Sequence, residues 1–254
     1  MKKLHLLSAL VGALALCAGG LAQAALLING DLDNPGTHES DLTVGWTLEE
    51  SKQTPGPTDT ATFASFANHT PNPNAPGADP DTTRTGVWYK NFTGAANNLA
   101  TAHLYQDVAG TPGMKYILTG WSRFEMFYAG GFNLVPSIDP VTGEFVLSPS
   151  PTKSVFALDF LGAGDALISS VEWDLHDDGG QINNNQWVQH MVMATAPDGT
   201  VEVRARSSAI DMIGTFGSQS AFADDFTLVC VPEPSSMALG LLGLVGLFAM
   251  ARRK

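Results

Sequence analysis

Short stretches of alternating apolar and polar residues fill the middle of the chain. In residues 201–206, which read Val-Glu-Val-Arg-Ala-Arg, apolar and charged side chains alternate, as they do in a strand with one buried face. No apolar pattern with helical spacing persists for three turns, and Gly or Pro interrupts the pattern about every dozen residues. Ten strands are therefore predicted, at residues 25–28, 60–66, 87–92, 101–108, 115–127, 154–160, 168–174, 187–194, 200–207 and 221–229. Ten short antiparallel strands predict an all-β sandwich of the jelly-roll type.

Two segments between these strands lack a strand pattern. Residues 68–85 are rich in Asn, Pro and Asp and are typical of a long exposed loop. Residues 135–152 contain four prolines around a small hairpin predicted at Thr142-Gly143. Both segments fit either the border of a binding face or a tolerated surface insertion, and the sequence leaves these two interpretations open.

The two ends of the chain are apolar and flanked by cations. Met1-Lys2-Lys3, an apolar run over residues 6–21 and Ala22-Gln23-Ala24 have the three parts of a secretory signal, so we predict a signal helix that is cleaved after Ala24. Near the other end, apolar residues 237–251 precede Arg252-Arg253-Lys254. About 15 apolar residues make a short transmembrane helix against the ~20 that span a bilayer, which suits a temporary anchor. The chain therefore divides into a signal (1–24), a β-sandwich domain (25–230) and a tail (231–254).

The tail carries a specific motif. Val231-Pro232-Glu233-Pro234, the short glycine-containing apolar run and the terminal basic cluster together resemble the PEP-CTERM sorting signal of Gram-negative bacteria. This resemblance implies that an exosortase recognises Pro232, Glu233 and Pro234 and cleaves there, after the tail has held the chain transiently in the inner membrane. It also implies a final location at the cell surface or in an extracellular matrix that contains exopolysaccharide. From hydropathy alone, an ordinary single-pass anchor remains the alternative.

Acidic residues dominate the central domain. The chain has 13 Lys and Arg residues against 25 Asp and Glu, with a net charge of −12. Five of the basic residues lie at the two ends, whereas 24 of the acidic ones lie between them. Such a domain repels phosphate backbones, so nucleic acid is not expected as a partner. Because Cys17 lies in the signal, Cys230 is the one thiol expected in the exported protein, which excludes an intramolecular disulfide.

Several stretches of the central domain are similar to galactose-binding-like jelly rolls and carbohydrate-binding modules. Residues 27–33 with Gly45-Trp46 resemble the opening of these modules, residues 105–108 and 112–121 their central strand-turn-strand, and residues 222–229 their closing strand. Residues 130–153 have no counterpart. The resemblance implies a jelly roll whose first and last strands run side by side.

In such modules a structural calcium ion often joins the first and last strands. The resemblance assigns the early ligand to Asp33 and the late one to Asp224 or Asp225. Hard oxygen ligands suit Ca²⁺, although Asp33 is one methylene shorter than the Glu that is common at its position. These acids are equally consistent with turn residues and the edge of the final strand. A second acidic cluster, at residues 174–178, lacks the spacing of an EF-hand loop and favours a solvated turn.

Aromatic side chains supply the candidate sugar-binding residues. Flat rings stack on the apolar faces of pyranose rings, and neighbouring amides and carboxylates bind the hydroxyl groups. Trp88, Trp121 and Trp187 are the predicted ligand contacts, with Asn and Gln abundant around Trp187. Trp88 and Tyr89 are adjacent in a strand and must face opposite sides, so at most one of them lies in the core.

Signatures of known enzyme classes are missing from the sequence. It contains no G-x-S-x-G, H-E-x-x-H or phosphate-binding loop, and its histidines have no metal-ligand spacing. We therefore expect a non-catalytic protein that binds carbohydrate or another matrix component. Two alternatives remain: a structural or adhesive matrix protein that binds protein partners, and a secreted glycan-active enzyme whose paired carboxylates meet only in the fold.

Overall fold

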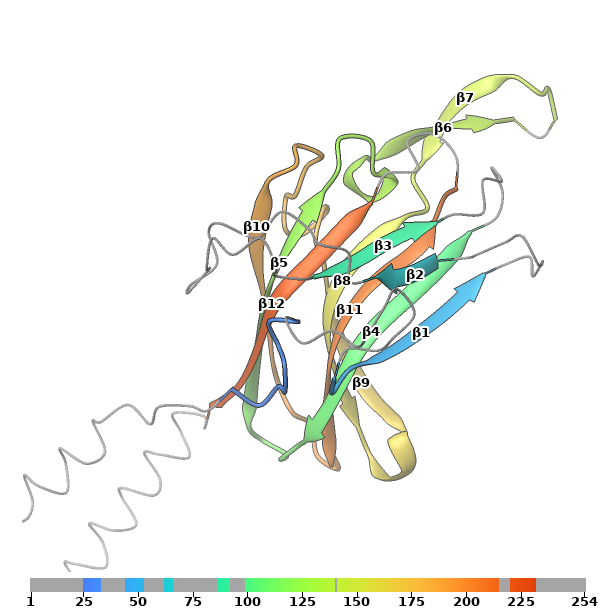
Figure 1. Cartoon of the computed structure of the whole chain (residues 1–254). Coiled ribbons are helices and arrows are strands. Elements are labelled where there is room, and N and C mark those ends of the chain that lie inside the picture. Colours follow the sequence, from blue (N-terminus) through green and yellow to red (C-terminus); the bar gives the residue numbers. More distant parts are fainter. Residues whose placement is uncertain are drawn as a thin grey trace, which may run out of the picture.

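A computed structural model describes residues 25–32, 44–52, 62–65, 86–91, 99–139, 141–214 and 220–231 (Figure 1). The predicted signal helix, the long loop at residues 68–85 and the transmembrane tail after residue 231 lie outside the described residues. Within these residues the chain forms twelve strands and two short 3-10 helices, η1 (Ala129–Gly131) and η2 (Ala163–Asp165). No described helix is both long enough and apolar enough to cross a membrane.

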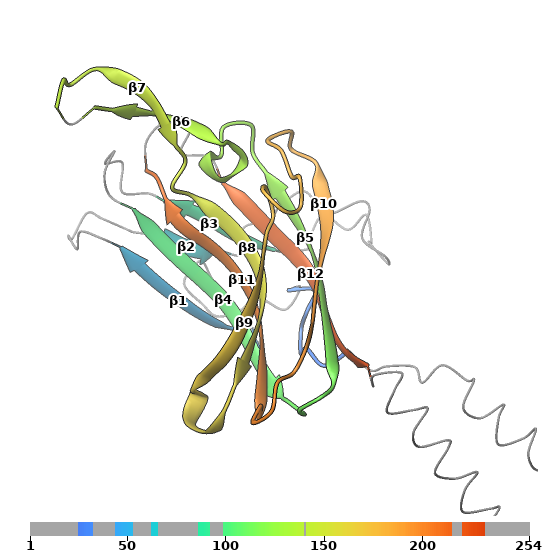
Figure 2. The ribbon, with the colours of Figure 1, turned by 180° about the vertical axis from the view of Figure 1, so that it is seen from behind.

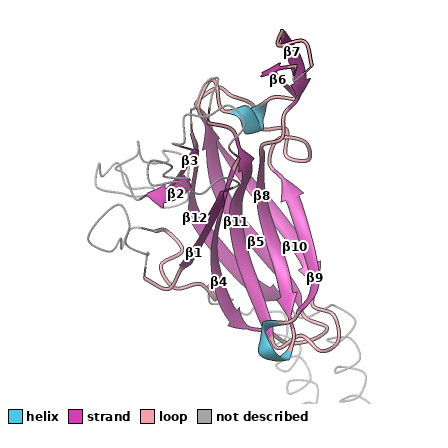
Figure 3. Ribbon diagram, turned by 90° about the vertical axis from the view of Figure 1, so that its right-hand side faces the viewer, coloured by secondary structure: helices cyan, strands magenta, loops and turns pink. Residues whose placement is uncertain are grey.

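Ten of the strands form two packed antiparallel sheets (Figure 3). Sheet A has the order β1 (Thr47–Lys52), β4 (Ala100–Ala109), β11 (Glu202–Met212), β8 (Lys153–Leu161) and β9 (Leu167–Asp174). Sheet B has the order β10 (Trp187–Thr195), β5 (Lys115–Phe124), β12 (Ala221–Val231), β3 (Val87–Asn91) and β2 (Thr62–Ser65). From β9 to β12, consecutive strands along the chain alternate between the sheets. The predicted all-β jelly-roll sandwich is confirmed.

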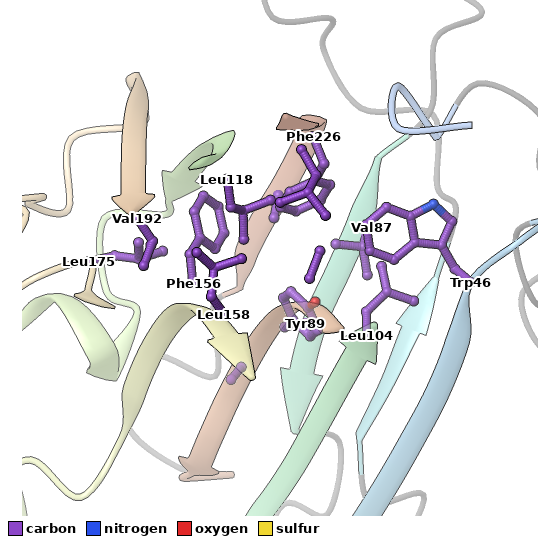
Figure 4. Packing of buried hydrophobic residues seen from close by; sticks show 14 of the residues in the cluster. Trp46, Val87, Tyr89, Leu104, Leu118, Phe156, Leu158, Leu175, Val192 and Phe226 are labelled. Carbon is purple, nitrogen blue, oxygen red and sulfur yellow. The ribbon is translucent and has the colours of Figure 1, made fainter. Parts of the chain in front are cut away.

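The core lies between the inner faces of the two sheets (Figure 4). In β5, strict alternation directs Tyr116, Leu118 and Phe124 inward, where each is almost fully buried. Phe156 of β8 meets Phe226 of β12 across the layers, with ring centroids 5.2 Å apart. Burial of each such side chain stabilises the fold by roughly 1.5–3 kcal/mol, so the facing aromatic rings hold the sheets together.

A β-bulge in β12 changes which residues face the core. The register of β12 against β5 shifts by one residue between Asp224 and Thr227, and Asp225 has a left-handed φ of 52°. Before the bulge Phe222 lies on the outer face, whereas after it Phe226 and Leu228 are buried in the core. Because of the extra residue, even-numbered residues point to the outer face before the bulge and to the core after it.

The amino-terminal segment differs from the prediction. The strand predicted at residues 25–28 is wrong: residues 25–32 form a series of turns, with left-handed φ values at Asn29 and Leu32. The buried side chain of Gln106 binds both backbone groups of Ile28, at 2.7 and 2.9 Å. These side-chain bonds replace a strand ladder.

This segment nevertheless lies beside the last strand, as the resemblance implied. The backbone N–H of Leu26 donates to the carbonyl oxygen of Leu228, and that of Phe226 donates to the carbonyl oxygen of Gly30. The indole N–H of Trp46 also donates to the carbonyl oxygen of Asn29, at 3.0 Å. The chain's first described residues are thus fixed onto β12 close to its bulge.

The hairpin predicted around Thr142-Gly143 is present and projects from one end of the sandwich (Figure 2). It pairs β6 (Leu134–Ile138) with β7 (Phe145–Pro149). At its turn a carboxylate oxygen of Asp139 accepts hydrogen bonds from the backbone N–H groups of Val141 and Thr142. One face of the hairpin is apolar and exposed, formed by Leu134, Pro136, Ile138, Phe145, Leu147 and Pro149.

Candidate ligand-binding face

Four side chains form a row across the outer face of sheet B. Trp187 of β10 lies directly opposite Arg123 of β5, Arg123 opposite Phe222 of β12, and Phe222 opposite Trp88 of β3. Trp121 lies two residues before Arg123 on β5 and therefore shares its face. The structure thus brings all three tryptophans predicted from the sequence to one face of sheet B. Figure 1 shows the four strands of this row, β10, β5, β12 and β3, side by side.

Strand alternation explains why these side chains point outward. On β5, Ser122 and Phe124 are buried between the sheets, whereas Trp121 and Arg123 are partly exposed on the other side. On β3, Tyr89 is 2% exposed and belongs to the core, while its neighbour Trp88 is partly exposed. The prediction that Trp88 and Tyr89 face opposite sides is confirmed.

Arg123 lies between two aromatic rings of this row. Its guanidinium carbon is 4.4 Å from the ring centroid of Phe222 and 5.4 Å from that of Trp187. Burial lowers the pKa of Arg123 below its ordinary value, but a guanidinium stays charged at any physiological pH. At the other end of the row, the ammonium nitrogen of Lys90 lies 5.6 Å from the ring of Trp88. The face therefore combines aromatic rings with two cations.

Nε of Arg123 and Nε1 of Trp187 are buried without a hydrogen-bond partner among the described residues. Nearby, Gln189 is exposed and lies directly opposite Trp121. Aromatic surfaces, unused donors and an amide are the groups that bind a sugar, through stacking and through hydrogen bonds.

Arg123 and Phe222 were not predicted as part of the site. The alternation in residues 115–127 does place Trp121 and Arg123 on one face of a strand, so a signal for Arg123 is present in the sequence. Phe222 joins the row only through the pairing of β12 with β5, which a single sequence does not specify.

The predicted calcium ligands are only partly placed. Asp33 lies outside the described residues, whereas Asp224 and Asp225 lie at the bulge of β12, next to the segment that holds Gly30. The backbone N–H of Asp225 donates to a carboxylate oxygen of Asp224 at 2.7 Å. Within the described part of the chain, no group of three or more His, Cys, Asp or Glu side chains is arranged to hold a metal. The calcium site stays a prediction.

The second acidic cluster forms a turn after β9, as the sequence favoured. A carboxylate oxygen of Asp174 accepts hydrogen bonds from the backbone N–H groups of His176 and Asp177. A carboxylate oxygen of Asp178 in turn accepts one from the backbone N–H of Asp174, at 3.0 Å. The carboxylates therefore accept hydrogen bonds from the backbone of their own turn.

A separate polar cluster lies between the sheets. The side-chain carbonyl of Gln181 accepts a hydrogen bond from Ser122 and lies 2.9 Å from Nε2 of His190. Burial lowers the pKa of His190 to about 4, so this imidazole is neutral at pH 7. All three side chains are almost fully buried, and a substrate cannot contact them without opening the sandwich.

Comparison with known families identifies the carboxyl-terminal tail. Residues 231–254 match the PEP-CTERM protein-sorting motif. The motif marks an exported protein that passes through the membrane and that an exosortase processes. A search of curated proteins found no match.

Solved structures are similar to this chain at low sequence identity. The active domain of tailspike protein 4 of bacteriophage CBA120 is 11% identical, with a TM-score of 0.51 over 82% of this chain and 21% of that one. This chain thus spans about a fifth of the tailspike domain's length. TmCBM61, solved with β-1,4-galactotriose, is 15% identical over 81% of this chain and 97% of its own, with a TM-score of 0.42. The Stig cyclase Fisc of Fischerella sp. TAU is 13% identical over 83% and 99%, with a TM-score of 0.48.

Proposed function

We propose that the central domain binds polysaccharide on the outer face of sheet B, without catalysis, at the cell surface or in the extracellular matrix. The observation that carries this proposal is the row of Trp187, Arg123, Phe222 and Trp88 with Trp121 beside it. The outer face of a sandwich sheet is ordinarily polar, because it is in contact with water. On this face Trp187 and Phe222 are only 8% and 5% exposed, whereas Trp88 and Trp121 are partly exposed. These two partly exposed tryptophans favour a binding surface.

The arrangement suits a chain of sugars better than a single small molecule. The strands of a sheet lie about 4.8 Å apart, so the row from β10 to β3 extends over about 14 Å. The partly exposed rings of Trp121 and Trp88, on β5 and β3, offer stacking to separate residues of a polymer. Export of the chain brings this face to the compartment in which such polymers are found.

The test is a glycan array, followed by calorimetry, on protein purified from the cells that export it. Trp121→Ala removes one ring from the face, and we expect it to weaken binding about 10-fold or more, since an aromatic stacking contact is worth ~1–3 kcal/mol. Trp173→Ala is the matched control, because Trp173 is an exposed tryptophan of β9 in the other sheet. Binding to no glycan, or equal affinity of Trp121→Ala and wild type, would contradict the proposal.

A further inference from the structure

We infer that the polysaccharide bound on this face is anionic, and that Arg123 binds the carboxylate of one of its sugar residues. This inference rests on the proposed function and adds the class of ligand. It starts from a difference between Arg123 and the other arginines that the structure describes.

Those other arginines are both paired with acids. Arg204 stacks on the ring of Tyr105, 3.7 Å from its centroid, and binds Asp107 through two hydrogen bonds of 2.7 and 2.9 Å. Arg206 binds Asp159 in the same two-pronged way. Arg123 also lies against aromatic rings, but within the described residues its guanidinium has neither an ion pair nor a hydrogen bond. It therefore has the environment of Arg204 without the carboxylate.

A partly buried guanidinium without an acceptor is unfavourable, because it has lost water and gained no hydrogen bond in exchange. The neighbouring indole N–H of Trp187, a residue only 8% exposed, lacks an acceptor as well. Both donors belong to residues that face each other on β10 and β5. Nε of Arg123 is buried, but the residue as a whole is partly exposed, so a ligand carboxylate can accept a charge-assisted hydrogen bond from the terminal nitrogens of its guanidinium.

The acids near this place are Glu125 and Asp224, which lies directly opposite Trp121 on the same face. Glu125 is the acid whose charge reaches Arg123, and one of its carboxylate oxygens already accepts the backbone N–H of Ser220 at 2.7 Å. Lys90 adds a second cation at the Trp88 end of the row. The domain's overall negative charge acts over longer distances and is screened within ~8 Å at physiological ionic strength. Local contacts with Arg123 therefore decide the preference.

The experiment compares polymers that differ only in charge. De-esterified polygalacturonate carries a carboxylate on each sugar, while its fully methyl-esterified form has the same backbone and none. An array of neutral, carboxylated and sulfated glycans is screened in parallel, with protein purified from the cells that export it. We expect wild type to bind carboxylated glycans in preference to neutral or esterified ones, with an affinity that falls as salt is raised.

Arg123→Gln is expected to weaken binding of the carboxylated ligand about 10- to 100-fold, the value of a charge-assisted hydrogen bond. Arg123→Lys keeps the charge but not the fork, so part of the affinity should remain. Arg204→Gln is the control and should bind as wild type does, because Arg204 lies on the other sheet. Circular dichroism establishes that each variant is folded.

The outcomes separate the two proposals. If wild type binds only neutral glycans, the proposal of polysaccharide binding is supported and the inference of an anionic ligand is overturned. Binding restricted to sulfated glycans, or unchanged affinity of Arg123→Gln for the carboxylated one, overturns the assignment of Arg123 to a carboxylate. If no glycan binds, the proposed function itself fails.

Discussion

The guanidinium of Arg206 and the carboxylate of Asp159 form two hydrogen bonds, of 2.7 and 3.1 Å, between neighbouring strands of sheet A. The two side chains are only 11% and 9% exposed. Glu172 adds a further bond to the same guanidinium, at 2.8 Å, from strand β9. The pair is shielded from water, so the loss of one partner leaves a charge that is difficult to solvate.

Asp159→Ala is therefore expected to destabilise the domain by about 3 kcal/mol. The control is Asp107→Ala, whose pair with Arg204 is 22–30% exposed and should cost less than ~1 kcal/mol. Urea unfolding of both variants measures the difference in free energy. Equal losses for the two variants would contradict the role of burial.

His190 should make the fold sensitive to acid. Its pKa is about 4 in the folded protein, because burial disfavours the charged form, and near 6.5 when unfolded. The unfolded state therefore takes up the proton first, and stability falls as pH drops from about 6.5 towards 4, by roughly 2–3 kcal/mol. His190→Gln removes this titrating group, so the difference in unfolding free energy between pH 7 and pH 4.5 should become smaller. A variant with the pH dependence of wild type would show that other groups cause it.

Gly30 should not tolerate a side chain. A Cβ atom there would clash with the carbonyl oxygen of Phe226, which is backbone and cannot rotate away. Gly30→Ala is therefore expected to cost roughly 1–3 kcal/mol in thermal or urea unfolding. In the control, Gly162→Ala, the new Cβ meets the flexible end of Ile168 at 3.3 Å, and the cost should be much smaller. If Gly30→Ala is as stable as wild type, the segment does not pack on β12 as described.

Replacement of Pro232, Glu233 and Pro234 by alanine should block processing. The exosortase then lacks its recognition motif, so the full-length chain is expected to stay in the membrane fraction while wild type is released from it. Immunoblots of fractionated native cells measure this. Ser235→Ala with Ser236→Ala changes the next two residues and should leave processing normal. Normal release of the alanine variant would show that the motif is not what the protease reads.

Calcium removal tests the remaining site prediction. If Asp33 and the Asp224-Asp225 pair hold Ca²⁺, chelation should lower the Tm of the folded protein, because a ligand that binds only the native state stabilises it. Asp225→Asn should then reduce the response to chelator. An unchanged Tm in saturating chelator would remove the metal assignment.

Strands β5 and β11 were predicted from their alternation, since one face of each is buried, whereas β8 was predicted from a short apolar run that is buried on both faces. β1 was missed because Thr47–Lys52 lies at the edge of sheet A and its side chains are mostly exposed, so its sequence has no alternation. The turns of residues 25–32 depend on a hydrogen bond between Ile28 and Gln106, which lies 78 residues later in the sequence. Contacts of that range are not visible in a local pattern.

The candidate face likewise contains residues that the sequence predicts and residues that only the fold reveals. Its tryptophans were predicted because residue type alone indicates sugar stacking. Arg123 was identified as part of the site only from strand pairing, which places Trp187 and Phe222 on either side of it. Similarly, two adjacent aspartates do not reveal that Asp225 is the extra residue of a bulge, since that is fixed by how β12 matches the neighbouring strand.

The direction of β12 has a consequence for the protein during its passage through the membrane. The strand begins beside Arg123 and ends at Val231, where the sorting motif starts. Val231 lies nine positions after Phe222 in the extended strand, a length of about 30 Å. If the tail tethers the chain as predicted, the aromatic row therefore lies at the end of β12 that is farthest from the sorting motif.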